Sequence, residues 1–556
     1  MKTRIICYGL WVIGAMMPLG AFAQMNNVIE VENDYKPTVK DADKISSLPQ
    51  VQETAVKHYN VQFSNTARPT TNYSSTPMDL ITSDPTLLEQ YGFITGAYGL
   101  NSSTFVRAAS RFGLTQYDFL SADIVFDGFN TDVDHYLYND DWKSRFFQLK
   151  PQLSFEHRFK NNGALIVSAD MTSQVFNYQT IGQQPSADWT DKQHNTGTNI
   201  GVQLTPFCIG DHFAISLDAG LSWFRQKYAT NRNEGLKENT IRMAVTPSYR
   251  FNEQHSADVT VKWTNSGYND SDIHSNGYFD IMPHYRFSNQ QMDLTLGAYI
   301  SMSNGKFNVA PDAILTYHAD KTTDIYVSAQ AGNSFQPMGY LCGMSPYFAL
   351  PIFYNAAPEW HKYNAKAGVR FSPIDALNID IHGGYDQSDN RAEILPQPLH
   401  DYADLSAAPS NYYNVIPLIT QVNGNHAHAG IDVSYRLKNT LSLELKNTWN
   451  HWGTTDDFDN VNITWRPILD LDWKANVNIL SNLKLGVGCR LQTFNKENGY
   501  YERDNTFDLG ADLTYTFFKG LSVYIQGENL LNQSFDRYQF YRSPGITARL
   551  GVAYSF

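Results

Sequence analysis

The chain has 556 residues, 14% of them aromatic, and a formal net charge of −13 at pH 7. This acidity argues against a nucleic-acid partner, which would require a basic surface. The mean hydropathy of −0.39 is too polar for a bundle of membrane helices. A polar chain rich in Tyr, Phe and Trp suits a transmembrane β-barrel, because only alternate strand residues face lipid and aromatic girdles mark both interfaces.

Residues 1–23 have the features of a cleavable signal peptide. Lys2 and Arg4 precede the apolar run Ile5–Leu19, and Ala21-Phe22-Ala23 forms a small-residue cleavage site. The apolar run is too short to span a bilayer. We therefore expect a secreted mature chain that begins at Gln24.

Residues 24–90 are polar, show little periodicity and contain five prolines spread along them. Two interpretations stay open for this N-terminal extension. It is either a flexible periplasmic tail or a segment that enters the barrel mouth or docks a partner.

From Tyr91 onward the sequence repeats a period-2 stretch followed by a connection. In one example, apolar Phe213, Ile215, Leu217, Leu221 and Trp223 alternate with small or polar residues. These stretches run for about 10–14 residues, which is the length that a tilted strand needs to cross a bilayer. Strands of soluble sandwiches average about 5–6 residues.

The connections alternate between short and long. Short turns are predicted at Lys160–Gly163, Ile209–His212, Asn252–Ser256, Ser288–Gln291, Ala319–Thr323, Pro373–Ala376, Lys438–Thr440 and Phe518–Gly520, and near Gly113 and Ser481. Long connections are predicted at Asn130–Ser144, Gln179–Gln193, Asn333–Lys362 and Gln387–Asn425, with Asn411–Val422 interpreted as loop. We therefore predict that residues 91–556 form an all-β, antiparallel transmembrane barrel of about 22 strands, with short periplasmic turns and long extracellular loops.

The alternation also predicts which charged side chains line the lumen. The candidates are Arg107, Arg111, Lys150, Glu156, Arg242, Arg250, Lys366, Arg370, Glu444 and Arg466. A ring of one sign would indicate ion selectivity. The mixed signs favour internal ion pairs or a lumen packed by another segment.

The long connection Asn333–Lys362 is unusually apolar for a solvated loop. It contains Tyr340, Tyr347, Phe348, Phe353, Tyr354 and Trp360. Apolar surface of this extent usually marks an interaction site. A lid over the lumen, a docking face for a surface protein, and packing against the second apolar loop, Gln387–Asn425, all stay open.

Signals of catalysis or metal binding are weak. His426, His428 and Asp432 share a strand face, but polar lumen lining explains them better than a metal site, which would need ligands from neighbouring strands. The sequence has no nucleophile elbow, phosphate loop, H-E-x-x-H or C-x-x-C. The three cysteines after the signal peptide do not predict a disulfide framework. We expect neither an enzyme nor a bound cofactor.

The last residues resemble the C-terminal strands of TonB-dependent receptors. Gly527–Phe535 reads G-E-N-L-L-N-Q-S-F, Tyr541–Gly545 reads Y-R-S-P-G, and the chain ends in A-Y-S-F. Ile546 stands where those receptors usually have Arg after Pro-Gly. The resemblance implies a receptor-sized barrel in the cell outer membrane.

Receptors of that family carry a folded plug domain before the barrel, for which residues 24–90 leave no room. Glu30–Val39 resembles the start of plug-less, receptor-like barrels of the Bacteroidota. Val28–Val31 is loosely similar to a TonB box. Engagement of TonB is left open, because energised gating has no obvious target without a plug.

Two functions follow from these patterns. The first is a receptor-like channel that moves a solute across the outer membrane, which the resemblance favours narrowly. The second is a non-conducting structural or assembly subunit of an outer-membrane complex. The expected partners are outer-membrane lipids including lipopolysaccharide, and a surface lipoprotein or other complex subunit is a candidate.

Overall fold

A computed structural model describes residues 92–136, 140–160, 163–179, 192–227, 235–270, 273–303, 305–350, 354, 356–398, 415–438, 440–454, 463, 465–495 and 503–556. The predicted signal peptide, the extension at residues 24–90 and Phe353 lie outside these residues. The statements below concern the described part of the chain.

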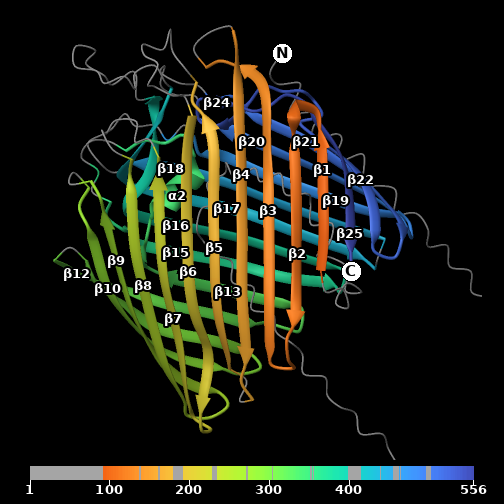
Figure 1. The fold of residues 1–556 in the computed structure, drawn as a ribbon. Helices are drawn as coiled ribbons and strands as arrows, with labels where there is room; N and C mark the ends of the chain where they lie inside the picture. The colour runs from red at the N-terminus through yellow and green to blue at the C-terminus, as the bar shows by residue number, and fades with distance from the viewer. Residues whose placement is uncertain are drawn as a thin grey trace, which may run out of the picture. The chain divides into compact units, whose positions relative to one another are not determined.

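Nearly all of this part is β-strand (Figure 1). The first half consists of β1 Gly92–Gly99, the short 3-10 helix η3 Leu100–Ser102, β2 Thr104–Gly113, β3 Asp118–Asp134, β4 Asp141–Arg158, β5 Ala164–Asn177, β6 Lys192–Ile209, β7 Phe213–Gln226, β8 Lys237–Arg250, β9 His255–Tyr268, β10 Asn276–Ser288, β11 Met292–Ser303, β12 Lys306–His318 and β13 Thr323–Gln330. The second half consists of β14 Gly332–Ser334, helix α2 Met338–Met344, β15 Glu359–Ile374, β16 Leu377–Pro398, β17 Pro417–Leu437, β18 Leu441–Thr454, β19 Pro467–Leu480, β20 Leu483–Phe494, β21 Thr506–Phe518, β22 Leu521–Glu528, β23 Asp536–Tyr538, β24 Tyr541–Arg542 and β25 Thr547–Ser555.

These strands close into one antiparallel barrel. β25 pairs with β1, with Gly96 opposite Val552, and the backbone N–H of Phe556 donates to the carbonyl of Gly92 at 2.9 Å. β13 and β14 both pair with β15 and act as one interrupted strand, whereas β23 and β24 form a separate small sheet. The described residues therefore form a barrel wall of 22 strands, which confirms the predicted fold.

The predicted short turns alternate around the wall with the connections at the other end, but not all of those connections are long. Only two residues join β11 to β12, and the predicted long connection Asn130–Ser144 is wrong in its bounds, because β3 ends at Asp134 and β4 begins at Asp141. All of the predicted short turns join consecutive strands at one end of the barrel, which we call the short-turn end. Two of these turns contain glycines with positive φ, Gly210 at 73° and Gly520 at 94°, a conformation that other residues rarely adopt. We call the opposite end, which carries the longer connections, the long-loop end.

The predicted loop Gln387–Asn425 is wrong in its bounds. β16 continues to Pro398 and β17 begins at Pro417, so the part of Asn411–Val422 from Pro417 onward is strand rather than loop. Arg391 pairs with Val422 and Ile394 with Ile419 in this extension. This extension of β16 and β17 projects beyond the neighbouring strands as a two-stranded hairpin. Its apolar side chains are buried, and the sequence alone does not distinguish them from an apolar loop.

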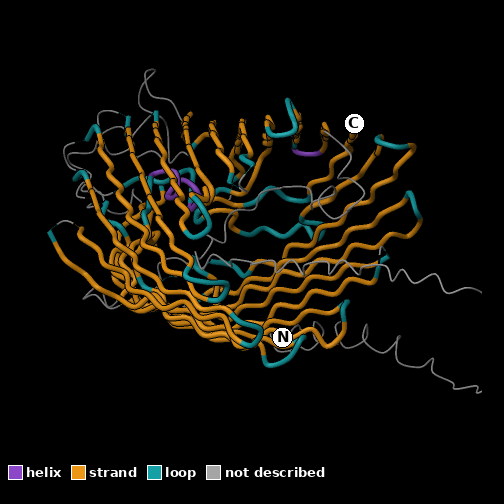
Figure 2. Tube along the Cα trace, turned by 90° about the horizontal axis from the view of Figure 1, so that it is seen from below, coloured by secondary structure: helices purple, strands orange, loops and turns teal. Residues whose placement is uncertain are grey.

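The two faces of the wall differ in chemistry. Large apolar side chains such as Ile124, Leu153 and Leu221 are exposed on the outside, as lipid contact requires. Many buried side chains of the wall are polar, Gln174, Thr264 and Asp280 among them. Loops and a short helix lie inside the ring of strands (Figure 2). No helix among the described residues is long and apolar enough to cross a membrane.

Candidate functional site

Several charged side chains predicted for the lumen form ion pairs with neighbouring strands. The pairs are Arg107 with Asp123 at 2.9 Å, Arg111 with Glu156 at 2.6 Å, Arg370 with Asp380 at 3.3 Å and Glu444 with Arg436 at 3.8 Å. Each of these side chains is at least partly open to solvent except Asp380. Pairs of this kind contribute little to stability, about 0–1 kcal/mol each. Within each pair the two charges compensate each other without making the wall apolar.

The remaining predicted lumen residues have different surroundings. Lys150 and Arg242 are exposed. The guanidinium of Arg250 donates to the carbonyl of Asp211 at 2.8 Å, at the short-turn end. The ammonium of Lys366 lies 5.8 Å from the ring centre of Tyr326. Arg466 precedes β19, so its predicted place on a strand is wrong.

The long-loop end of the lumen contains a folded segment that we call the lid, residues Gln336–Leu350. Its centre is α2, which begins after Pro337 and ends where the N–H of Ser345 donates to the carbonyl of Leu341 at 3.1 Å. One side of this short helix is apolar and fully buried: Met338, Leu341 and Met344 are each 0% exposed.

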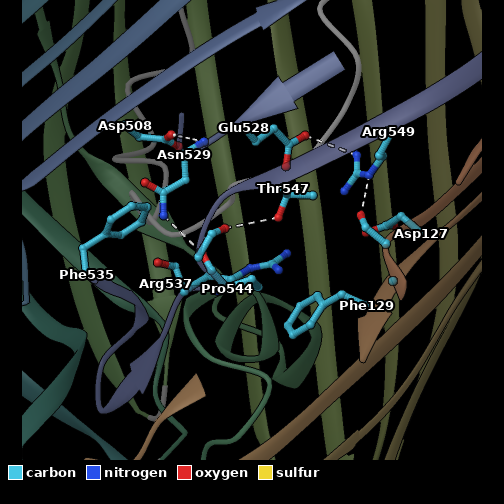
Figure 3. A pocket seen from close by; sticks show the side chains of 14 residues that line it. Asp127, Phe129, Asp508, Glu528, Asn529, Phe535, Arg537, Pro544, Thr547 and Arg549 are labelled. Atoms are coloured by element: carbon cyan, nitrogen blue, oxygen red, sulfur yellow. Dashed lines mark hydrogen bonds and ion pairs between the residues drawn. The ribbon is translucent and has the colours of Figure 1, made fainter. Parts of the chain in front are cut away.

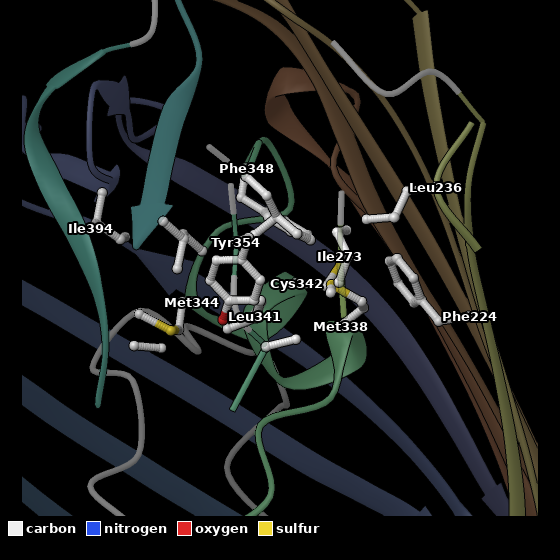
Figure 4. Packing of buried hydrophobic residues seen from close by; sticks show 14 of the residues in the cluster. Phe224, Leu236, Ile273, Met338, Leu341, Cys342, Met344, Phe348, Tyr354 and Ile394 are labelled. Carbon is white, nitrogen blue, oxygen red and sulfur yellow. The ribbon is translucent and has the colours of Figure 1, made fainter. Parts of the chain in front are cut away.

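The buried face of the lid packs against the wall and against the projecting hairpin (Figure 4). Phe224 and Leu236, from the β7 and β8 side of the barrel, and Ile273 join the cluster from one side, and Ile394 of β16 joins it from the other. Burying each large apolar side chain contributes roughly 1.5–3 kcal/mol. The lid is therefore held by a hydrophobic core at the long-loop end of the lumen.

Four inward-facing polar side chains on consecutive strands also bind the lid; we call them the lid-binding row. They are Gln174 of β5, Asn195 of β6, Gln226 of β7 and Glu238 of β8. All four are buried, with exposed fractions of 7% or less. The sequence does not identify these four residues, because an inward polar side chain gives the same alternation pattern whether it faces water or a lid.

Each member of the row makes one hydrogen bond or more to the lid. The bonds run from Cys342 Sγ to Gln174 Oε1 at 2.9 Å, from Asn195 Nδ2 to the carbonyl of Pro346 at 2.9 Å, from Gln226 Nε2 to the carbonyl of Phe348 at 3.1 Å, and from the N–H of Met338 to Glu238 Oε2 at 3.1 Å. Burial raises the pKa of the Cys342 thiol to about 12, so the thiol keeps its proton and can donate.

Two other loops hold the far end of the lid. The Tyr347 ring stacks on the Tyr541 ring of β24, with ring centres 3.6 Å apart. Ala349 exchanges backbone hydrogen bonds with the start of β17: its N–H donates to Pro417 at 2.9 Å, and its carbonyl accepts from Ile419 at 3.0 Å. The lid therefore joins the wall, the β16–β17 hairpin and the β22–β25 loop.

A buried charge cluster closes the same end beside the hairpin. The Glu393 carboxylate, 0% exposed, accepts from Arg391 Nε at 2.6 Å, from Arg466 Nε at 2.9 Å and from Trp465 Nε1 at 2.8 Å. The Arg466 guanidinium also lies 4.5 Å from the ring centre of Trp452. Because one carboxylate serves two guanidiniums, this cluster depends on every partner being present.

A small polar pocket lies between the β22–β25 loop and the wall (Figure 3). Glu528 accepts from Arg549 Nη1 at 3.2 Å, and Asp508 accepts from the N–H of Asn529 at 3.0 Å. The Arg537 guanidinium lies 5.1 Å from the ring centre of Phe129 on β3. The pocket therefore contains charges of both signs, and their hydrogen bonds attach the β22–β25 loop to the wall.

The aromatic residues predicted for the lid or docking loop point mainly inward. Tyr347, Phe348 and Tyr354 are 2%, 0% and 2% exposed, and Tyr340 of α2 is partly buried against the same cluster. Trp360 belongs to β15, not to a loop, and lies 6.0 Å from the Tyr299 ring. The predicted loop therefore ends before Trp360, because β15 begins at Glu359.

The histidines that share a strand face contact neighbouring rings and a neighbouring amide of the wall. The His426 ring stacks on Trp452 with centres 3.6 Å apart, and its Nε2 bonds Asn450 at 2.9 Å. His428 lies 6.0 Å from the His382 ring. Within the described residues, no group of three or more His, Cys, Asp or Glu side chains is placed to hold a metal ion.

Comparisons with known proteins identify the fold. No protein-family model and no curated protein sequence matches the chain. Its structure is similar to the iron transporter FrpB from Neisseria meningitidis, at 10% identity over 84% of this chain and 82% of that one, with a TM-score of 0.61. The siderophore receptor PirA from Acinetobacter baumannii matches at 10% identity, 84% and 80% coverage and a TM-score of 0.60. The ferric-catecholate import receptor Fiu from E. coli matches at 11% identity, 84% and 82% coverage and a TM-score of 0.57.

At these identities the comparison establishes the fold. The chain has the same barrel fold as these import receptors and this iron transporter, and the resemblance of its last strands to TonB-dependent receptors agrees with that fold. A barrel of this architecture lies in the outer membrane. The absence of a plug and the kinship with Bacteroidota proteins stay predictions.

Proposed function

We propose that this chain is an outer-membrane transport barrel that admits a solute when the lid, Gln336–Leu350, leaves the long-loop end of the lumen. The observation that carries the proposal is the way the lid is held. It is not part of the wall, but is attached by its own apolar core and by hydrogen bonds to the lid-binding row. Such contacts can break and re-form without disturbing the backbone ladder of the barrel.

The solute class is also a proposal. The similar structures are a ferric-catecholate import receptor, a siderophore receptor and an iron transporter. A ferric catecholate chelate is therefore the first solute to test. A sugar of similar size serves as the comparison, because a barrel without selectivity would pass both solutes.

A reversible lock tests whether the lid must move. Asn195 Nδ2 lies 3.3 Å from Cys342 Sγ, so Asn195→Cys places a second thiol beside the native one. In a background with Cys208→Ser and Cys489→Ser, oxidation would cross-link the lid to the wall, and formation of the bond is verified by mass spectrometry. Asn195→Ser, treated identically, is the matched control.

The readout is solute uptake into proteoliposomes. We expect the oxidised lock to abolish uptake, a reductant to restore it, and the control to be indifferent to both treatments. Equal uptake by the oxidised and reduced lock would overturn the proposal, because the solute would then pass without lid movement. No uptake in any state, even after a Gly-Ser linker replaces the lid, would favour the structural subunit instead.

The alternative of a docking face has less support. The aromatic side chains that suggested it are the buried ones, Tyr347, Phe348 and Tyr354. In the chain by itself they fill the lumen end and are not presented to a surface protein. A stoichiometric partner in a pull-down of the native protein would restore that alternative.

A further inference from the structure

The outer surface of β6, β7 and β8 carries a group of basic side chains at the long-loop end. We call this group the outer basic patch: Lys192, Arg225, Lys227 and Lys237. All four are exposed. They alternate with buried members of the lid-binding row, Gln226 and Glu238, which are each 2% exposed and face the lumen. Side chains of neighbouring strand residues point to opposite faces, so the basic side chains point away from the lumen.

Strand register brings these side chains together. Arg225 lies directly opposite Lys237 on β8 and opposite Thr196 on β6. The N–H of Lys227 donates to the carbonyl of His194 at 2.9 Å, two residues from Lys192. Adjacent strands are about 5 Å apart, so the basic groups occupy a strip about 10 Å wide. The strip follows the rim where β6, β7 and β8 run side by side (Figure 1).

The patch borders directly on the lipid-facing belt. Trp223, 41% exposed, lies on the same outer face two residues from Arg225, which is about 7 Å along the strand. Ile241 and Met243, 39% and 44% exposed, continue the apolar face below Lys237, with Ile241 about 13 Å away. Tryptophan is enriched where hydrocarbon meets head groups, so the basic groups sit at head-group depth.

We propose that the outer basic patch binds the phosphate groups of lipid A, the membrane anchor of lipopolysaccharide, in the leaflet on the long-loop side. Lysine and arginine form charge-assisted hydrogen bonds with phosphate oxygens. The adjacent outer face of Trp223, Ile241 and Met243 offers an apolar surface for acyl chains. A free phosphate ion would use only the charges, whereas a lipid phosphate uses both features, and this favours the lipid.

The test neutralises three of the four basic side chains of the patch and leaves the lumen side chains unchanged. The variant is Arg225→Gln, Lys227→Gln and Lys237→Gln in the full-length protein. The control is Lys160→Gln, Lys321→Gln and Lys519→Gln, which removes three exposed lysines from turns at the short-turn end. Heat-modifiable mobility on gels confirms that both variants are folded barrels.

The measurement is binding of diphosphoryl lipid A to the purified protein in a zwitterionic detergent. Each basic group near a lipid surface contributes about fivefold in affinity, so the patch variant should bind roughly a hundredfold more weakly. The control should match the wild type. Unchanged binding by the folded patch variant would overturn the proposal. Competition by millimolar inorganic phosphate as strong as that by lipid A would show a simple anion site and would also overturn it.

The outcome is independent of the proposed transport. The patch lies on the outer face, so its neutralisation should leave the oxidised-lock experiment unchanged. Failure of one proposal would not imply failure of the other.

Discussion

Phe348 offers the most direct way to loosen the lid without altering the wall. Its side chain is 0% exposed, belongs to the same buried cluster as Phe224, and follows the stacked Tyr347. Replacing a buried phenylalanine by alanine costs about 3–5 kcal/mol. Because the backbone ladder that closes the barrel does not involve Phe348, we expect the cost to fall on docking of the lid.

This free energy converts into an expected change in the lid equilibrium. A cost of about 3–5 kcal/mol shifts the ratio of undocked to docked lid by roughly 150- to 4000-fold. If the lid is the barrier, the open probability in single-channel recordings of Phe348→Ala should rise by a comparable factor until it saturates.

Phe307→Ala is the matched control. Phe307 is 65% exposed on β12, so the same substitution removes a phenylalanine from the outside of the barrel. We expect wild-type open probability for this control. Hydrogen exchange of Gln336–Leu350 reports lid docking separately. An undocked lid in Phe348→Ala with wild-type conductance would refute the reasoning, because the lid would then not limit passage.

Three further predictions concern neighbouring parts of the molecule. Glu393→Gln leaves two buried guanidiniums around a neutral amide and should cost about 3–5 kcal/mol of local stability. The measurement is faster hydrogen exchange at the backbone amides of Trp465 and Arg466 with unchanged heat-modifiable mobility, and unchanged exchange would mean that the charges are not coupled. Burial raises the pKa of Asp536 to about 6, so docking of the β22–β25 loop should be strongest below pH 4 and weaken as pH rises through 6. Exchange protection of Asp536–Arg542, corrected for intrinsic rates, should show this trend in the wild type, and an equal trend in Asp536→Asn would contradict it. Deleting residues 24–90 should raise conductance in planar bilayers if the extension occupies the periplasmic mouth, and large, equal conductance with and without it would remove that idea.

The sequence predicts the wall better than what fills it. Period-2 alternation and turn residues fix each strand locally, so the short turns, from Lys160–Gly163 to Phe518–Gly520, fall where expected. The alternation pattern does not predict the projecting part of the β16–β17 hairpin, because the lid buries it and its sequence is as apolar as the loop beside it. The alternation continues before β19 and so predicts a strand position for Arg466, whereas in the structure Glu393 holds its side chain in the buried cluster.

The lid-binding row shows a limit of pattern reading. Alternation places Gln226 and Glu238 on the inner face, but their partners, Phe348 and Met338, belong to the lid and lie 122 and 100 residues later in the chain. Only the folded chain brings that loop to them. The apolar content of the loop indicated burial against something, while three different partners stayed open. A contact between a strand end and a distant loop leaves no periodic signal in either segment.

The alternation at the ends of β7 and β8 ties the inside of the barrel to the outside. Gln226 faces the lid while Arg225 and Lys227 face outward, and Glu238 and Lys237 repeat the arrangement on the next strand. A slip of one residue in either strand would exchange the two faces. It would put a guanidinium or ammonium against the apolar core of the lid and would leave the carbonyl of Phe348 or the N–H of Met338 without its partner. A single slip would incur both free-energy costs. The ends of β7 and β8 therefore favour the register that places hydrogen-bonding groups where the lid needs them.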